Sequence, residues 1–471
     1  MRRIPSAPRF RLSITLLVVA TATPLRAQQL APCPTAEFGP RADCGTLAVW
    51  EDRAAGIGRR IDIRFVVLRA AGARAPEPVF MFAGGPGAGS TTLAELANGP
   101  LAPVRETRHI VLVDQRGTGG SNPLPCPTDA ATNPAAAFGH VFDPAVMRRC
   151  RVELSRRADL ALYTTDLAVQ DVDDVRRFLG YDRVIVAGGS YGTRMAQAYA
   201  RRYPERVKAL VLDGVVPFDF AAPSTYARSL QQSIERVLRS CRERSSCRDS
   251  FPALEAEFDT LVARFGKGPI TATVTLRDGG RAPVTMHLGD FGYAVRGILY
   301  APGLTRRLPA MIHHAASTGD VSEFAQRYWL RAMDFEHFAD GLHLSVFCAE
   351  DVPNIRDEDV DSLTRGAFIG RYLIDEYRGA CAEWDGATVD PDLRRPLASE
   401  IPTLLLSGWF DPVTPPETAE RVARTLPMSR QVVDPRAGHG SSVGCARRAT
   451  LHVLINGSLD GLPAVCESPP G

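Results

Sequence analysis

The stretch Val184-Ile185-Val186-Ala187-Gly188-Gly189-Ser190-Tyr191-Gly192-Thr193 decides how this chain folds. An apolar, β-branched run leads into Gly-x-Ser-x-Gly, and residues 194–200 continue with a helical pattern. A strand, a sharp turn and a helix in this order form a nucleophile elbow, in which a serine projects from the edge of a sheet. The positions two before and two after the serine must be very small, because they press against the adjoining strand and helix. We therefore predict a catalytic nucleophile at Ser190 rather than a plain glycine-rich loop.

The composition is that of a soluble globular enzyme. The chain has 471 residues, of which 45% are hydrophobic and 23% charged, which is enough for a sizeable core. Of its 55 Lys and Arg residues, five lie within residues 1–27, where there is no acid, so 50 basic residues remain against 53 acidic ones. No basic stripe remains, and nucleic acid is therefore not an expected partner.

The N-terminus resembles an export signal. A cationic start precedes an apolar run, Leu12–Ala22, that is too short to span a bilayer. We expect cleavage after Ala27, with Ala22 as the alternative and a retained anchor as the competing interpretation. No later stretch is long and apolar enough to span a membrane. The mature protein is thus expected in the periplasm or outside the cell, without a stable membrane anchor.

The cysteines agree with export. Ten cysteines form an even set, as is usual in an oxidising compartment. Their connectivity stays open from sequence, but pairing neighbours would give 33–44, 126–150, 241–247, 348–381 and 445–466. None forms a Cys-x-x-Cys pair, and no His/Cys cluster has zinc spacing, so we predict no metal site.

The order of apolar segments predicts an α/β fold. Residues 46–50 and 61–68 alternate as antiparallel strands do, whereas the later strands are continuous apolar runs at 78–82, 109–114, 184–187, 207–212, 402–407 and 431–433. Helices are expected at 165–179, directly after Ser190, and at 443–455. Strands that alternate with helices indicate a mostly parallel sheet covered on both faces.

The pattern changes between the two groups of strands. Helices at 226–239 and 254–265, a hairpin at 271–286 and further helices replace the strands. We interpret residues 216–399 as a mainly helical cap over the mouth of the site. The expected organisation is therefore a signal peptide at 1–27, a first core part at 28–215, this cap, and a second core part at 400–471.

Three residues that follow strands form a candidate triad. Ser190, Asp411 and His439 come in the order nucleophile, acid, histidine, and residues at the carboxyl ends of parallel strands meet at one edge of the sheet. His439 would take the proton of Ser190 and return it to the leaving group, while Asp411 would orient the imidazole. Asp213 also ends a strand and is the competing acid.

The loop after residues 78–82 supplies a candidate oxyanion hole. Gly84 to Ser90 place unhindered N–H groups beside the nucleophile, and we expect the amides of Gly85 and Tyr191 to bind the oxyanion. A phosphate loop is excluded because Ser90 stands where the lysine should be. Arg116, in the next strand's loop, is expected to tie loops together.

With these residues identified, the chain from about Cys44 onward resembles the proline iminopeptidase and tripeptidyl aminopeptidase branch of the α/β-hydrolases. The resemblance rests on six motifs: Gly84-Gly85-Pro86-Gly87, Asp114-Gln115-Arg116-Gly117-Thr118-Gly119, Gly188-Gly189-Ser190-Tyr191-Gly192, Val211-Leu212-Asp213-Gly214, Cys348-Ala349-Glu350 and Asp411-Pro412-Val413-Thr414-Pro415. It implies an α/β-hydrolase fold and a serine exopeptidase without cofactors, whose partners are peptide substrates with a free N-terminus. Prolyl iminopeptidases usually carry His where Ala83 stands, which argues against a strict proline preference.

An exopeptidase must recognise the ammonium group of a chain end. A desolvated ammonium needs a fixed carboxylate, and the resemblance suggests Glu350 for this role, with Asp351 or Glu336 as alternatives. The alternative, purely structural interpretation is that Glu350 caps a helix or faces solvent. An esterase or lipase with the same triad, and a non-catalytic binding module, are the alternative functions. The number of residues removed, the natural substrate and the oligomeric state stay open.

Overall fold

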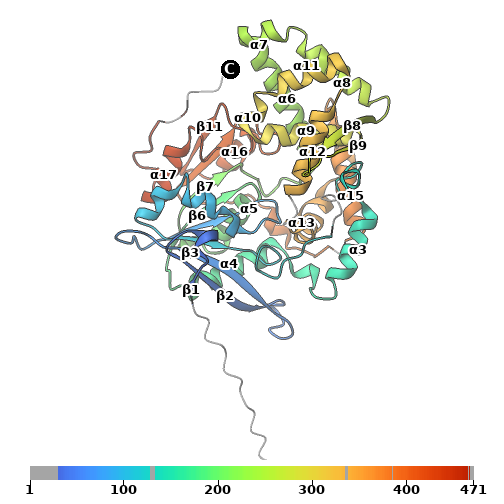
Figure 1. Cartoon of the computed structure of the whole chain (residues 1–471). Helices are drawn as coiled ribbons and strands as arrows, with labels where there is room; N and C mark the ends of the chain where they lie inside the picture. Colours follow the sequence, from blue (N-terminus) through green and yellow to red (C-terminus); the bar gives the residue numbers. More distant parts are fainter. Residues whose placement is uncertain (1–29, 128–132, 335–337, 385, 465, 467–471) are drawn as a thin grey trace, which may run out of the picture.

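The computed structural model describes residues 30–127, 133–334, 338–384, 386–464 and 466 (Figure 1). The expected signal peptide, residues 1–27, and the alternative amine ligand Glu336 lie outside these described residues. None of the described helices has both the length and the apolar character to span a bilayer.

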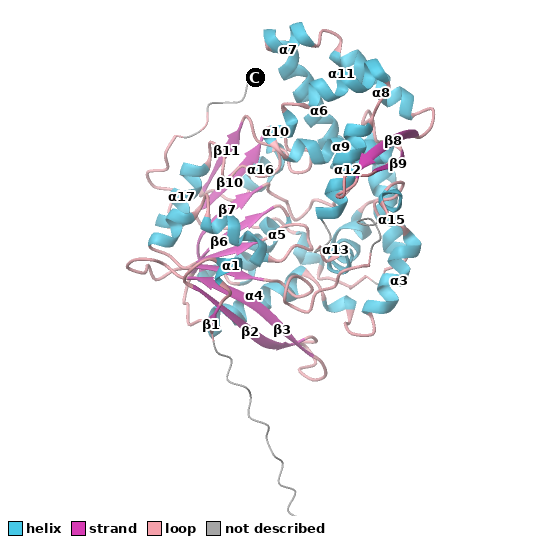
Figure 2. Cartoon of the chain, viewed as in Figure 1, coloured by secondary structure: helices cyan, strands magenta, loops and turns pink. Residues whose placement is uncertain are grey.

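A nine-stranded sheet forms the centre, in the order β1-β2-β3-β5-β4-β6-β7-β10-β11 (Figure 2). Its strands are β1 Ala31–Pro32, β2 Ala42–Trp50, β3 Arg60–Leu68, β4 Val79–Phe82, β5 Ile110–Val113, β6 Val184–Gly189, β7 Val207–Asp213, β10 Thr403–Gly408 and β11 Ser429–Asp434. The strands β5, β4, β6, β7, β10 and β11 pair in parallel in this order. The strands β1, β2 and β3 extend the sheet antiparallel. The expected mostly parallel α/β sheet is confirmed.

Alternate residues of the central strands face two separate cores. In β5, Val111 and Val113 belong to one core and Ile110 and Leu112 to the other. The first core includes α4 Thr165–Phe178, α5 Tyr191–Arg202 and α16 Pro416–Ala423, and the second includes α1 Thr35–Phe38, α2 Ala94–Asn98 and α17 Arg447–Asn456. Each fully buried Val, Ile or Leu stabilises the fold by about 1.5–3 kcal/mol, so both faces hold the sheet rigid beneath the site.

The last helix begins later than the sequence predicted. We expected a helix from residue 443, but α17 starts at Arg447. The preceding amides are engaged by side chains: Ser441 and Ser442 donate to the carboxylate of Asp213, and Cys445 donates to Asp434. Carboxylates that accept backbone N–H groups hold this segment in turns, which delays the helix.

The segment between β7 and β10 adds no described strand to the central sheet. It contains α6 Tyr226–Glu243, α7 Ser245–Ser250, α8 Leu254–Phe265, the hairpin β8 Ile270–Thr275 and β9 Arg281–Met286, α9 Leu288–Tyr300, α10 Pro302–Thr305, α11 Leu308–Thr318, α12 Ser322–Asp334, α13 Asp340–Val346, α14 Asp357–Thr364 and α15 Tyr372–Ala382. The ring of Phe291 lies 4.9 Å from those of both Phe265 and Phe324, so the segment packs around aromatic residues of its own. These helices lie beside the carboxyl edge of the sheet (Figure 1).

Five disulfides link the cysteines that are neighbours in the sequence. The bonds are Cys33–Cys44, Cys126–Cys150, Cys241–Cys247, Cys348–Cys381 and Cys445–Cys466, as the neighbour pairing predicted. Cys126–Cys150 links the loop after β5 to α3 Pro144–Leu154, in which Cys150 lies. Cys348–Cys381 joins a π-helical turn, Phe347–Asp351, to α15.

Candidate active site

Ser190 occupies a sharp turn between β6 and α5. Its φ of 55° and ψ of −124° are a conformation that non-glycine residues rarely adopt, as expected for a strained nucleophile elbow. A methyl group on Gly188 would lie 2.1 Å from the carbonyl oxygen of Gly192, and one on Gly192 would lie 2.2 Å from that of Phe82. Close approach of the backbone therefore requires both glycines, as we predicted from their positions two residues before and after Ser190.

Asp411 and His439 lie in hydrogen-bond contact. The carboxylate Oδ2 of Asp411 is 2.8 Å from His439 Nδ1, and Oδ1 accepts the amides of Val413 and Thr414 at 2.9 Å. The Thr414 hydroxyl donates to Oδ2 at 2.8 Å. Asp411 is fully buried, and although burial acts to raise its pKa, His439 and these donors outweigh burial and lower it. The carboxylate thus stays ionised and can hold the imidazole in one tautomer.

His439 lies close to the elbow as well. A methyl group on Gly214 would lie 3.2 Å from His439 Cε1, and the carbonyl of the preceding residue, Asp213, accepts the Ser190 amide at 2.8 Å. The imidazole is only partly buried, with 11% of its side chain exposed. The structure therefore brings Ser190, Asp411 and His439 to one edge of the sheet.

Asp213, the competing acid, has other partners. Both of its carboxylate oxygens accept the amide of Ser441 at 2.9 Å, and it also accepts the Ser441 hydroxyl and the Ser442 amide. These bonds hold the loop that follows His439. The geometry favours Asp411 as the partner of the imidazole and gives Asp213 a role in positioning that loop.

The glycine-rich loop after β4 passes directly beside the nucleophile. A methyl group on Gly84 would lie 2.9 Å from Ser190 Cβ, and Gly85, Ser190 and Tyr191 line the same narrow pocket. Tyr191 opens α5, where backbone N–H groups lack partners within the helix. Gly85 and Tyr191 thus border the same pocket as Ser190, and their role as oxyanion donors stays a prediction.

A buried charge cluster forms one wall of this pocket. Asp351 accepts two hydrogen bonds from Arg194, at 2.7 and 2.8 Å, and both residues line the pocket together with Ser190. Glu350 lies behind them: its two oxygens accept the amide and the hydroxyl of Thr165, both at 2.7 Å, and Oε2 is 3.8 Å from Arg194. Burial raises the pKa of Glu350 against the opposing influence of Arg194 and Thr165. The carboxylate that borders the pocket is therefore that of Asp351, with Glu350 one step further back.

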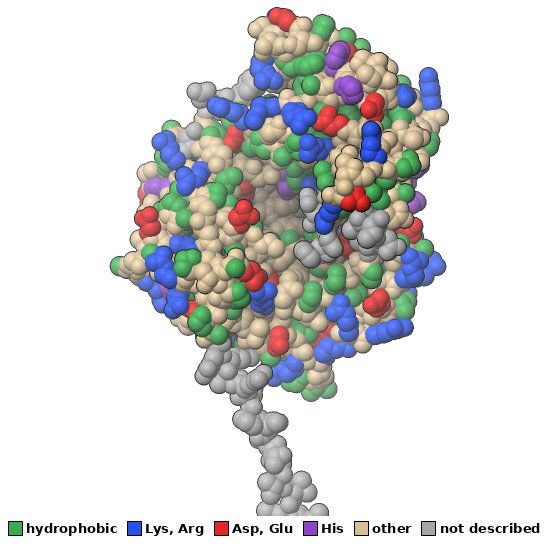
Figure 3. Space-filling model, in the orientation of Figure 1, with side chains coloured by type: hydrophobic (Ala, Val, Ile, Leu, Met, Phe, Trp, Pro, Cys, Tyr) green, Lys and Arg blue, Asp and Glu red, His purple; other side chains and the backbone are tan. Residues whose placement is uncertain are grey.

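The segment between β7 and β10 contacts the site at several points. Ser233 of α6 donates to the carbonyl of Asp411 at 2.8 Å. A methyl group on Gly438, next to His439, would lie only 1.9 Å from the carbonyl oxygen of Leu299 at the end of α9. The Tyr300 ring lies 4.5 Å from the imidazole of His439. Figure 3, drawn in the orientation of Figure 1, shows a recess near the centre of this face of the molecule.

Arg116 is a structural residue, as predicted. It is fully buried, donates twice to Asp171, at 2.7 and 2.9 Å, and donates to the carbonyls of Glu51 and Leu162. It therefore ties the loop after β5 to α4 and to the end of β2.

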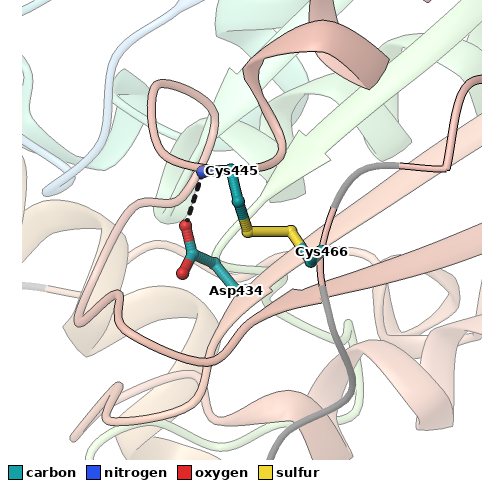
Figure 4. A group of neighbouring side chains, drawn as sticks. All are labelled: Asp434, Cys445 and Cys466. Atoms are coloured by element: carbon teal, nitrogen blue, oxygen red, sulfur yellow. Dashed lines mark hydrogen bonds between the residues drawn. A yellow bond between two sulfur atoms is a disulfide. The ribbon is translucent and has the colours of Figure 1, made fainter.

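One group of described residues, Asp434, Cys445 and Cys466, has the spacing of a metal site (Figure 4). Its two sulfurs are joined in a disulfide, and Asp434 accepts the Cys445 amide at 2.9 Å. Thiolates bind metals, whereas disulfide sulfurs do not serve as such ligands. The group is therefore a structural link.

Sequence reasoning missed several residues around the site. It assigned no role to Arg194, Thr414, Tyr300 or His343, which is buried and hydrogen-bonded to the carbonyl of Pro86 at 2.8 Å. Thr414 belonged to a quoted motif, and its hydroxyl three residues after Asp411 was the only available signal. The others depend on contacts between the inserted segment and the sheet, which no local pattern encodes.

Comparison with known proteins agrees with the fold. Residues 77–257 match a model of the alpha/beta hydrolase fold, and residues 366–466 match a model of TAP-like proteins. Serine protease Hip1 of Mycobacterium tuberculosis is 25% identical over 352 residues, covering 69% of this chain and 67% of that protein. Proline iminopeptidase of Neisseria gonorrhoeae is 33% identical over 138 residues, covering 29% of this chain and 32% of that protein. The chain therefore has the α/β-hydrolase fold, and its C-terminal region is similar to TAP-like proteins.

Proposed function

We propose that this protein is an exported serine aminopeptidase that hydrolyses peptide bonds near a free N-terminus. The observation that carries the proposal is the ion pair of Arg194 and Asp351, which lines the pocket of Ser190, with the carboxylate of Glu350 behind it. Two carboxylates lie beside the Arg194 guanidinium in a buried site, and that of Asp351 faces the pocket. A substrate ammonium would pair with the Asp351 carboxylate, which gives a reason for selecting chain ends.

In the proposed reaction, Ser190 attacks the carbonyl carbon of the scissile peptide bond while His439 Nε2 takes the hydroxyl proton. The amides of Gly85 and Tyr191 stabilise the oxyanion, and each such donor contributes about 3 kcal/mol to lowering the barrier. His439 then protonates the leaving amine, which leaves an acyl-enzyme on Ser190. Water, activated by His439, releases the acyl group, and Asp411 stabilises the imidazolium throughout.

Two further features support the proposal. The relatives named serine protease and proline iminopeptidase suggest peptides as substrates. The five disulfides suit an oxidising compartment and support export. The helices between β7 and β10 serve as a cap, proposed to extend over residues 216–399, that restricts access to chain ends.

The test uses two peptides that differ only in N-acetylation. The third substrate is an ester of the acyl group that these peptides would transfer to Ser190. Wild type is expected to favour the free amine by about 2–5 kcal/mol in transition-state binding, as when one partner of a buried charge pair is removed. Asp351→Asn and Glu350→Gln should lose most activity on the free amine and discriminate far less. Glu323→Gln, which changes an exposed acid of α12 that pairs with Arg307, is the matched control and should behave as wild type.

The outcomes separate the functions. If wild type hydrolyses both peptides equally well, the protein is not an aminopeptidase. If it hydrolyses only the ester, the esterase interpretation replaces the proposal. If only one of the two acid variants loses discrimination, that residue holds the amine.

A further inference from the structure

Arg296 is a buried cation near the site for which the proposed reaction has no use. It lies on α9, four residues before Tyr300, and is only 9% exposed. Its guanidinium carbon lies 5.2 Å from the ring centre of Tyr226, 5.0 Å from that of Tyr293 and 5.4 Å from that of Tyr300. Nη2 donates to the Tyr300 hydroxyl at 3.1 Å, whereas Nε has no hydrogen-bond partner.

No carboxylate among the described residues forms an ion pair with this guanidinium. The acids of the site are already engaged, since Asp351 binds Arg194 and Asp411 binds His439. Taking an ion out of water costs several kcal/mol, which the faces of aromatic rings offset only in part.

Arg296 packs against one residue that lines the pocket and one residue that contacts the catalytic base. Tyr226 lines the pocket that contains Ser190, and Tyr300 lies against the imidazole of His439. Because Arg296 contacts both rings, one tyrosine side chain separates it from the pocket and another separates it from His439. A second cation, Arg331, lies 4.3 Å from the centre of the Tyr300 ring and adds to the positive potential there.

We infer that Arg296 is a specificity-determining residue that binds a carboxylate of the substrate. A carboxylate would supply the missing counter-charge, and guanidinium–carboxylate pairs are among the strongest charge-assisted hydrogen bonds. The site then has two recognition points of opposite sign, the carboxylate of Asp351 in the pocket wall and the guanidinium of Arg296 behind Tyr226. Such a site fits a peptide with an ammonium at one end and a carboxylate nearby.

This inference rests on the proposed function and narrows its substrate class to anionic peptides. The carboxylate has two possible sources, the C-terminus of a short oligopeptide or an acidic side chain. Both present the same chemistry to Arg296, and the substrates below distinguish them.

The experiment compares three short peptides with the same free N-terminus. The first has a C-terminal carboxylate, the second is its C-terminal amide, and the third is that amide with a Gln replaced by Glu. Product release is followed by mass spectrometry and gives kcat/KM for each peptide. Wild type is expected to favour the first or the third over the neutral amide at least tenfold, and the preferred one identifies the source of the carboxylate.

Three variants complete the design. Arg296→Met should reduce the preference to within twofold of unity while still hydrolysing the neutral amide, and Arg296→Lys should keep part of it. Arg201→Met is the matched control, because Arg201 also lies over an aromatic ring, 3.9 Å from Phe218, and should keep the full preference. Labelling by a fluorophosphonate verifies that each variant has a folded site.

Equal kcat/KM for all three peptides with wild type would overturn the inference and leave the proposed function standing. So would a preference that survives in Arg296→Met. If wild type hydrolyses none of the peptides, the proposed function fails and the inference falls with it.

Discussion

Asp411→Asn is expected to abolish nearly all turnover while leaving the fold intact. In wild type, Oδ1 accepts the amides of Val413 and Thr414, and Oδ2 accepts from the Thr414 hydroxyl and from His439 Nδ1. The asparagine oxygen can keep the two backbone bonds, because they need only an acceptor. Its amide nitrogen then faces His439 Nδ1 and donates to it, which moves the imidazole proton to Nε2.

With the proton on Nε2, His439 can no longer accept the proton of Ser190. Loss of the orienting carboxylate typically lowers kcat by about four orders of magnitude, or about 5.4 kcal/mol in the barrier. Asp213→Asn acts differently, since its bonds to Ser441 and Ser442 hold a loop. That variant should lose about 1–3 kcal/mol of stability and only a modest part of its activity.

The assay is hydrolysis of a free N-terminal peptide by both variants, together with thermal unfolding. Asp411→Asn should melt close to wild type and be nearly inactive. The reasoning is refuted if Asp213→Asn is the crippled enzyme while Asp411→Asn stays near wild type.

Other consequences of the structure can be tested in the same way. Gly438→Ala should destabilise the protein by about 1–3 kcal/mol in urea unfolding, because its methyl group would overlap the Leu299 carbonyl. The control Gly303→Ala has open space around the added methyl group and should keep the stability of wild type. Equal stability of the two variants would contradict the close approach of Gly438 to Leu299. Burial lowers the pKa of His343 to about 4, so the unfolded chain takes up a proton between pH 6.5 and 4 that the folded protein refuses. The folded state should therefore lose up to about 3 kcal/mol as pH falls through this window, and His343→Asn should show a correspondingly shallower loss; identical pH profiles would argue against a buried neutral imidazole. Peptide mapping without reduction should recover Cys445–Cys466 as one linked pair, and free thiols at both positions would contradict the pairing.

Much of the fold was predictable because it depends on local patterns. Continuous apolar runs identified the parallel strands, and the glycines around Ser190 indicated the elbow because backbone atoms approach within 2.2 Å of where their side chains would be. The start of α17 was wrong because the carboxylates of Asp213 and Asp434 bind the preceding amides. Bonds between residues so far apart in the chain leave no mark on helical periodicity.

The site was predictable only in part for the same reason. Ser190, Asp411 and His439 follow strands of one parallel sheet, and topology alone brings them to a common edge. The partners of Glu350 were not predictable, because Thr165 lies 185 residues away and is brought near only by the packing of the inserted segment. Arg296 gave no signal either, since its meaning comes from three tyrosine rings and from the absence of an ion-pairing acid among the described residues.

We propose that Ser190 is the nucleophile of a peptide hydrolase. The most direct measurement is to react the protein with one equivalent of a fluorophosphonate, locate the adduct by peptide mapping, and follow hydrolysis of a free N-terminal peptide in the same sample. We predict a single adduct on Ser190, with activity lost in proportion to labelling, and no adduct in Ser190→Ala. An adduct on another residue, or peptide hydrolysis that persists when Ser190 is fully labelled, would contradict the claim.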